Sequence, residues 1–141
     1  MIDWTDIRTV LLDMDGTLLD LHYDNHFWME YLPRAYAEAK GVPEVDAREH
    51  LGSRFAEVRG SLPWYCIDYW SKTLGMDIPS LKRELRHMIR MRPYALDFLR
   101  WLHASDMDVL LVTNAHRETL NIKMGEVDIT GWFDRVVVSH D

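Results

Sequence analysis

Three short apolar runs in the chain have the length and composition of buried β-strands. They span residues 9–13, 109–113 and 135–139, and each is rich in valine or leucine and gives way to polar residues. Continuous apolar runs of this length are typical of strands that are buried on both faces, as in a parallel sheet. We therefore predict three parallel strands, one near the amino terminus and two in the last third of the chain.

The residues around the second run have helical periodicity. Residues 94–104 place apolar side chains on one broad face, with Pro93 near the first turn. Residues 117–125 are also predicted to be helical, and Gly125 is the expected stop. Alternating strands and helices indicate a parallel sheet with right-handed crossovers. The predicted fold class is therefore α/β, with a three-layer core.

The segment from 21 to 92 interrupts this alternation. It has no strand pattern, and its apolar residues recur at helical spacing in four groups, which are separated by turn signals such as 41–43, 62–63 and 78–79. We predict four helices inserted after the first strand. Residues 1–20 and 93–141 would then form the sheet-containing core, and residues 21–92 a helical cap.

Composition narrows the function classes. The chain has 141 residues, of which 48% are apolar and 28% charged, and its formal net charge is −7. An acidic protein repels nucleic-acid phosphates, so we expect no nucleic-acid polymer as partner. Cys66 is the single cysteine, and no signal peptide or membrane-spanning run is recognisable. We therefore expect no membrane partner and a cytoplasmic location.

The loop Asp13-Met14-Asp15-Gly16-Thr17 directly follows the first strand. Ligands of open α/β sheets gather beyond the carboxyl ends of strands, where the Asp13 carboxylate could attack phosphorus and form an acyl-phosphate. Asp15 could reach the leaving-group oxygen, and its neighbouring carboxylate would raise its pKa for the acid role. Gly16 allows close approach of the backbone to a phosphate, and Thr17 offers a hydroxyl and an amide.

A second polar pair follows the next strand. Thr113 and Asn114 end the second apolar run, so their hydroxyl and amide would face the same crevice and hold phosphoryl oxygens. Two carboxylates beside a phosphate repel it, and the site therefore needs a hard cation. Mg²⁺ fits because it takes oxygen ligands and keeps several waters.

These two motifs resemble motifs I and II of the haloacid-dehalogenase-like (HAD) superfamily. The resemblance implies that Asp13 is the nucleophile, that Asp15 is the general acid/base, and that Asp13 and the Asp15 carbonyl bind Mg²⁺. It also implies that Thr113 and Asn114 bind phosphate, and that the helical insertion is a C1-type cap of subfamily I. Dehalogenases of this fold lack the second aspartate, so Asp15 indicates a phosphatase.

Within the superfamily, the chain is most similar to the bacterial GMP/IMP nucleotidases. The segments that carry this resemblance are 11–21, 24–25, 27–28, 64–66, 68–70, 74–75 and 113–116. Two further superfamily motifs, a lysine and a distal acidic pair, are not found before Asp141, and Lys123 lies too early to be that lysine. The superfamily's sheet order would leave the edge of the first strand unpaired, which favours homo-oligomer formation there.

Some polar residues of the insertion are candidates for substrate contact. His22 and Asn25 follow the phosphate loop, and His116 follows the second motif. His22 and His26 share a helical face, but zinc needs more ligands than these two. The aromatic residues at 64, 65, 69 and 70 could stack on a purine base, although an aromatic core of the cap explains them better. His116 could equally be a solvent-facing helix start.

The predicted function is Mg²⁺-dependent hydrolysis of a small phosphate monoester through an aspartyl-phosphate intermediate. A purine 5′-mononucleotide is the first substrate choice. One alternative is a catalytically impaired fragment that acts as a binding or oligomerising module. Another is a phosphatase for phosphoglycolate or a sugar phosphate, which the aromatic cap disfavours because small polar substrates need no stacking surface.

Overall fold

A computed structural model describes all 141 residues, and its centre is a parallel sheet of three strands. The strands are β1 (Thr9–Leu12), β2 (Asp108–Thr113) and β3 (Arg135–Val138), in the order β1-β2-β3. Leu12 pairs with Leu111 and Thr113 with Val138, so the carboxyl ends of β1 and β2 lie side by side. The three strands confirm the α/β fold class, and each ends within one residue of its predicted boundary.

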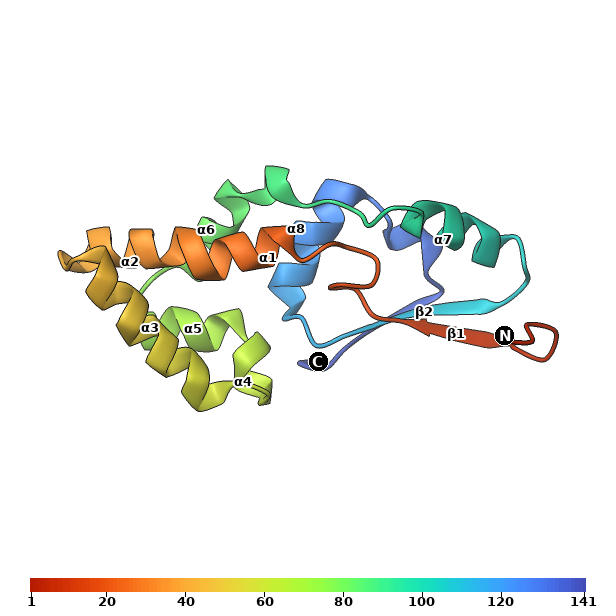
Figure 1. Cartoon of the computed structure of the whole chain (residues 1–141). Helices are drawn as coiled ribbons and strands as arrows, with labels where there is room; N and C mark the ends of the chain where they lie inside the picture. Colours follow the sequence, from red (N-terminus) through yellow and green to blue (C-terminus); the bar gives the residue numbers. More distant parts are fainter.

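Two helices connect the strands, α7 (Ala95–His103) before β2 and α8 (Arg117–Val127) after it. The connections from β1 to β2 and from β2 to β3 both move to the next strand in the same direction across the sheet. Because such connections are right-handed, both helices lie on the same face of the sheet. Figure 1 shows α7 and α8 on one side of the strands. The predicted three-layer core is therefore wrong for this chain, which has two layers there.

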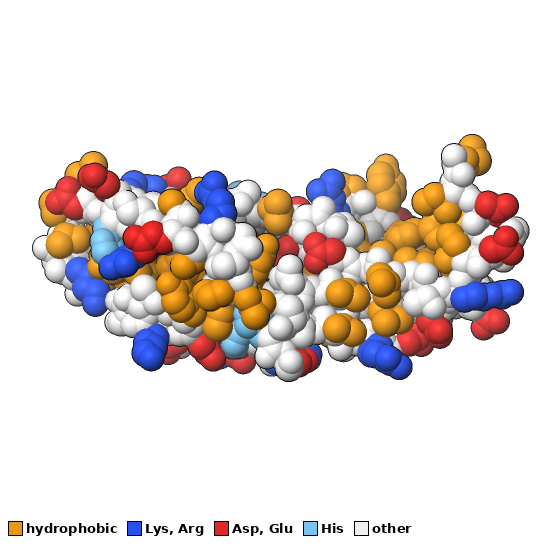
Figure 2. All heavy atoms as spheres, turned by 90° about the horizontal axis from the view of Figure 1, so that it is seen from below, with side chains coloured by type: hydrophobic (Ala, Val, Ile, Leu, Met, Phe, Trp, Pro, Cys, Tyr) orange, Lys and Arg blue, Asp and Glu red, His pale blue; other side chains and the backbone are white.

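Burial alternates along the strands as a consequence. Leu12, Val109 and Leu111 are buried under the helices, whereas Leu11 is 63% exposed and Val137 is 41% exposed on the opposite face. Hydrophobic side chains are visible on this open side in the half of the molecule that holds the sheet (Figure 2). The prediction of strands buried on both faces is wrong, because no element in the chain covers the second face.

After the loop that follows β1, all the regular elements up to α7 are helical. The first helix runs without a break through α1 (His22–His26), the π-helical turn η1 (Phe27–Tyr31) and α2 (Leu32–Lys40). The remaining elements are α3 (Glu44–Val58), α4 (Leu62–Tyr65), α5 (Ile67–Leu74), α6 (Ile78–Glu84) and the 3₁₀ turn η2 (Arg86–Met88). All four predicted helical groups are helical, but the third is divided into α4 and α5 at Cys66.

Helix ends follow local backbone chemistry. Gly41 and Gly75 cap α2 and α5 with left-handed φ angles of 66° and 63°, a conformation that glycine adopts without a Cβ penalty. Helix α8 continues past Gly125 and ends at Asp128, which takes the left-handed cap at φ 51°. The predicted stop at Gly125 is therefore wrong. The short 3₁₀ turn η3 (Thr130–Trp132) then leads into β3.

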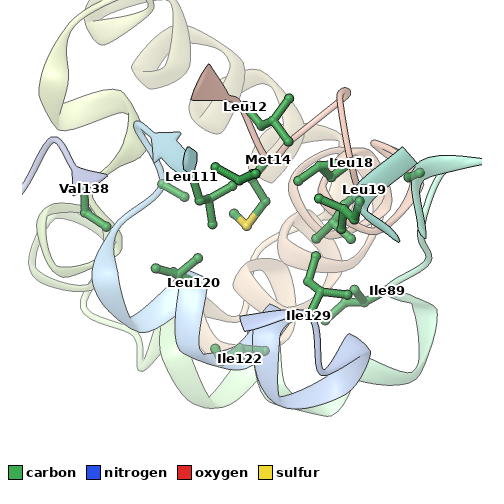
Figure 3. Packing of buried hydrophobic residues seen from close by; sticks show 14 of the residues in the cluster. Leu12, Met14, Leu18, Leu19, Ile89, Leu111, Leu120, Ile122, Ile129 and Val138 are labelled. Carbon is green, nitrogen blue, oxygen red and sulfur yellow. The ribbon is translucent and has the colours of Figure 1, made fainter. Parts of the chain in front are cut away.

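Two separate hydrophobic clusters hold the chain together. The larger one joins the helix-facing side of the sheet to α7 and α8 and includes Met14, Leu18 and Leu19 from the loop after β1. Figure 3 shows these side chains converging with Leu111, Leu120, Ile122 and Ile129. The smaller cluster lies within the helical segment, around Phe27, Phe55 and Trp70. Anchoring of the loop in the larger core fixes the position of the residues that follow β1.

The two crossings between the sheet and the helical segment pair with each other. The Asp20 amide donates to the Arg90 carbonyl at 3.0 Å, and the Arg92 amide donates to the Leu18 carbonyl at 2.8 Å. This pairing supports our proposal that the boundaries fall at 20/21 and 92/93. None of the helices is both long and apolar enough to cross a membrane.

Candidate active site

The loop after β1 is a tight turn built on one carbonyl group. The Met14 oxygen accepts from the amides of Thr17, Leu18 and Leu19 at 3.4, 3.0 and 2.9 Å. Gly16 has a φ of 78°, a left-handed conformation that costs other residues energy. Asp13 is exposed at the strand end, while Asp15 is partly buried. The turn therefore directs the two carboxylates into different environments.

Some backbone amide and carbonyl groups of this loop form hydrogen bonds within the chain, and others do not. The Gly16 amide donates to the Leu19 carbonyl at 2.8 Å, so it is not available to a ligand in this structure. The amide of Met14 and both the amide and carbonyl of Asp15 form no hydrogen bond within the chain. Met14 is fully buried, which leaves the amide of the partly buried Asp15 as the candidate donor, since backbone N–H groups at a strand end can bind the oxygens of an anion.

Asp15 is held by a lysine that is distant in sequence. The Nζ of Lys123, on α8, lies 2.5 Å from Asp15 Oδ1 and 2.5 Å from Asp24 Oδ2. The other oxygen of Asp24 accepts from Lys82 Nζ, on α6, at 3.1 Å. Both lysine side chains are almost completely buried. This chain of alternating charges joins the phosphate loop, α8 and the helical segment.

Burial and pairing shift these groups in opposite directions. Burial raises the pKa of Asp15 above its ordinary value, and the nearby Lys123 only partly opposes this. Burial alone would also raise the pKa of Asp24, but Lys82 and Lys123 outweigh it and hold it below the ordinary range. Burial lowers the pKa of Lys82, against the opposing effect of Asp24. Asp15 is thus the carboxyl in this network that is suited to carrying a proton.

A cavity of about 220 Å³ opens between the helical segment and the core. Asp15, Asp24 and Lys82 contribute its charged groups, and Asn25 and Thr119 its neutral polar ones. The remaining lining is apolar and largely aromatic: Leu21, Trp28, Phe55, Trp64, Tyr65, Ile67, Trp70 and Ala115. The general acid/base candidate therefore lies at the wall of an aromatic cavity.

The predicted phosphate ligands lie at the neighbouring strand end. Thr113 is buried, and its hydroxyl oxygen accepts from the Ala115 amide at 3.0 Å, which leaves its own proton free to donate. Asn114 and Thr17 are exposed. The strand register brings Thr113 and Asn114 to the same edge of the sheet as Asp13.

The predicted substrate residues do not all reach the cavity. Asn25 lines it, but His22 and His116 do not. His116 caps α8, where its Nδ1 accepts from the Glu118 amide at 3.4 Å, and its Nε2 lies 3.4 Å from Asp68 Oδ2 on α5. It thereby links α8 to the helical segment. The rings of His22 and His26 lie 6.2 Å apart, and no third metal ligand joins them.

Three residues of the site are not among those predicted from the sequence: Lys82, Thr119 and Lys123. Lys82 belongs to a basic stretch that reads as a solvated helix face, and Lys123 was considered only as a possible third-motif lysine. One signal was available for Lys123. It lies three residues after Leu120 and four before Val127, so it shares an apolar helix face with them, and a lysine buried on such a face needs a carboxylate partner.

The loop fits a Mg²⁺ ion through oxygen donors. The exposed Asp13 carboxylate and the unbonded Asp15 carbonyl are hard ligands from adjacent turns of the backbone. Mg²⁺ is commonly bound by one or two protein oxygens, with water and substrate phosphate completing its coordination. The donor set of this chain is compatible with such a site.

The chain matches a known protein family over most of its length. The model of the family described as haloacid dehalogenase-like hydrolase matches residues 7–141. GMP/IMP nucleotidase YrfG from Escherichia coli (strain K12) and from Shigella flexneri are each 39% identical over 139 residues, or 99% of this chain and 63% of theirs. The chain therefore spans less than two thirds of the length of these curated relatives.

Solved structures share the fold at lower sequence identity. A HAD phosphatase from Thermococcus onnurineus superposes with a TM-score of 0.82 at 22% identity, covering 94% of this chain and 62% of the other. An L-2-haloacid dehalogenase from Xanthobacter autotrophicus gives a TM-score of 0.53 at 20% identity, with coverages of 95% and 57%. At these identities the likeness supports the fold alone.

Proposed function

This chain belongs to the haloacid dehalogenase-like hydrolase family, and from this premise we propose that its site hydrolyses a purine 5′-mononucleotide in the presence of Mg²⁺. The observation that carries the proposal is the difference in environment between the two aspartates of the loop. Asp13 is exposed at the end of β1, whereas Asp15 is partly buried and held by Lys123 at 2.5 Å. The two carboxyl groups are therefore suited to different roles.

Asp13 would act as the nucleophile. Its carboxylate oxygen attacks phosphorus, a new P–O bond forms to Asp13, and the bond from phosphorus to the ester oxygen breaks. A water molecule then attacks the aspartyl-phosphate, which releases inorganic phosphate and restores the Asp13 carboxylate. Thr17, Thr113 and Asn114 would donate hydrogen bonds to the phosphoryl oxygens.

Asp15 would move the proton. Burial raises its pKa, which favours the protonated form that donates to the leaving oxygen. The resulting carboxylate then accepts a proton from the attacking water. Lys123 would hold one carboxyl oxygen so that the other is directed to the reacting atoms.

The Asp13 carboxylate and the Asp15 carbonyl would hold Mg²⁺. When bound, the ion neutralises negative charge on the phosphate and the two aspartates. The free amide of Asp15 would add a hydrogen-bond donor at the loop. This donor and the ion offset the repulsion between a dianionic substrate and an acidic site.

The substrate proposal rests on the relatives and on the cavity. The curated relatives are named for GMP and IMP, and the cavity next to Asp15 has aromatic walls against which a base could stack. Phosphoglycolate and sugar phosphates, the competing substrates, lack an aromatic ring that would use these walls. A nucleotide therefore matches the lining better.

Phosphate release from GMP, IMP, phosphoglycolate and glucose 6-phosphate, with and without Mg²⁺, tests the proposal. We expect release from the two nucleotides only with the metal, and complete loss after Asp13→Asn. Asp15→Asn should slow release by about 100-fold or more, the size of a general acid/base contribution. Asp6→Asn changes an exposed carboxyl far from the loop and serves as the control. Full turnover by the Asp13→Asn variant would exclude the nucleophile assignment.

A second candidate function follows from the open face of the sheet. Leu11, Val112 and Val137 expose apolar side chains there, and β1 has no neighbour on its outer edge. Unpaired strand edges and apolar faces favour association with another chain. The chain could therefore act as a binding or oligomerising module, with a second copy as the partner.

A further inference from the structure

The cavity beside Asp15 combines aromatic walls with a few polar groups, an arrangement that phosphate hydrolysis alone does not explain. Its volume of about 220 Å³ lies below the roughly 300–1,000 Å³ typical of sites for whole drug-sized ligands. It therefore suits one part of a nucleotide, with the remainder extending past Asp15. The aromatic walls indicate that this part is the base.

Five aromatic residues form the wall, and four of them pack against one another. Phe55 lies 5.8 Å from Trp64 and 5.1 Å from Trp70 between ring centroids, and Trp28 lies 5.8 Å from both Phe55 and Trp70. Tyr65 also lines the cavity and is 39% exposed. Rigid, mutually packed rings offer a preformed surface for a planar base, since every base has a π-face.

Thr119 gives evidence for a bound ligand that does not depend on the aromatic rings. The residue lies on α8, is only 6% exposed and lines the cavity. Its hydroxyl is buried and has no hydrogen-bond partner within the chain. A buried hydroxyl without a partner is unfavourable, and a bound group with a polar edge would remove that cost.

Lys82 has donors to spare at the same cavity. Its ammonium group carries three N–H donors, but its one hydrogen-bond acceptor is Asp24 Oδ1 at 3.1 Å. The group lies over the rings of Phe27 and Trp28, at 4.6 and 5.3 Å from their centroids, which fixes its position. A cation held in this way accepts a neighbouring oxygen and rejects a neighbouring amino group.

We propose that this cavity is a base subsite selective for 6-oxopurines, in which Lys82 donates to the oxygen at C6 and Thr119 pairs with the polar edge of the ring. The Asn25 amide lines the same space and can complete the contacts. Adenine would place its 6-amino donors against the ammonium of Lys82. The inference deepens the proposed nucleotidase function, because it assigns the selectivity to named residues.

Inosine and adenosine are the matched probes for this subsite. They differ at C6 and in the N1 proton that accompanies it, and neither carries the phosphate on which Asp13 would act. Three of the six tryptophans line the cavity, so their fluorescence should report occupancy by either nucleoside. We expect the 141-residue chain to bind inosine at least tenfold more tightly than adenosine. Equal affinities, or no binding of inosine in the millimolar range, would overturn the proposal.

Two variants assign the contacts. Thr119→Val keeps the side-chain shape and removes a hydroxyl that has no partner, so the fold should keep its stability while inosine affinity falls about three- to tenfold. Thr73→Val, on the exposed side of α5, is the control and should leave the affinity unchanged. Lys82→Met should bring the affinities for inosine and adenosine together. An unchanged inosine affinity in Thr119→Val would exclude the proposed placement.

The nucleoside-binding experiment and the phosphate-release experiment can fail independently of each other. A chain that releases phosphate from nucleotides but binds both nucleosides equally contradicts the subsite and leaves the catalytic proposal standing. A chain that selects inosine but never releases phosphate contradicts the catalytic proposal and supports the subsite.

Discussion

Lys123 Nζ lies 2.5 Å from Asp15 Oδ1, although 108 positions separate the two residues in the sequence. The contact forms because α8 packs between the sheet and the helical segment and directs one buried lysine toward the loop after β1 (Figure 1). The same ammonium group reaches Asp24 on α1. The position of the proposed proton donor therefore depends on both parts of the chain.

Replacement of Lys123 tests this dependence. Lys123→Met keeps the length of the side chain and removes the charge that opposes the effect of burial on Asp15, so the pKa of Asp15 should rise further. Carboxyl-carbon NMR titration of selectively labelled protein measures this shift directly. Lys72→Met, on the exposed side of α5, is the control and should leave the titration of Asp15 unchanged. An identical Asp15 titration in both variants would mean that the ion pair does not form in solution.

Asp24 should contribute strongly to stability because two buried lysines share it. At pH 7, Asp24→Asn should lower the free energy of unfolding by about 3–5 kcal/mol, the usual cost of leaving a buried charge without its partner. Urea unfolding measures the difference. Asp97→Asn, which breaks the exposed pair with Arg100, should cost less than about 1 kcal/mol.

The pH dependence of this effect has a defined sign. Lys82 and Lys123 overcome the effect of burial and hold the pKa of Asp24 below its unfolded value of about 3.9. The stabilisation is therefore present above that value and is lost as the pH falls through the lowered folded value. The gap between wild type and Asp24→Asn should narrow in acid. A gap that stays constant down to the acid transition would argue against an ionised Asp24.

Gly16 should be needed for the loop, and Gly41 offers a matched comparison. Both have left-handed φ angles, 78° and 66°, and a Cβ would meet no close contact at either, so backbone strain alone acts. Each alanine variant should lose about 1–2 kcal/mol of stability. Only Gly16→Ala should also reduce phosphate release, because Gly41 lies at the far end of α2. Equal activity of the two variants would show that the loop tolerates a different turn.

The open sheet face should control self-association if the second candidate function holds. Leu11→Lys introduces charge at the edge strand, where the side chain is 63% exposed, so stability should change by no more than about 0.5 kcal/mol. Sedimentation velocity should then show less dimer than for the wild type. Val45→Lys, at a 70% exposed site on α3, should leave association unchanged. A wild-type chain that stays monomeric at high concentration would exclude this function.

Local signals in the sequence were sufficient for much of the fold. Apolar runs identified the three strands, and helical spacing identified α7, α8 and the helices of the insertion. The motif at 13–17 identified the loop because its chemistry is carried by residues that are adjacent in the chain. The family assignment rests on the same contiguous segments and is confirmed by the match over residues 7–141.

Burial on the sheet could not be predicted from the runs themselves. Leu11 and Leu12 are equally apolar, yet one is 63% exposed and the other 8%. The difference arises because both crossover helices lie on the same face of the sheet, a property of strand order rather than of residue type. The extension of α8 past Gly125 is also tertiary in origin, since packing of the helix outweighs the modest preference of glycine to end it.

The sequence by itself determined the strand and the turn that carry Asp13 and Asp15, and it was sufficient to propose their roles, because these features follow one another within a few residues. Only the tertiary structure decided which partners they meet. Lys123 contacts Asp15 on the loop, and Lys82 and Thr119 line the cavity beside it, because α6 and α8 pack together although all three residues lie far from the loop in the chain. Long-range ion pairs and cavities depend on how helices pack, and no local pattern of residues records that arrangement.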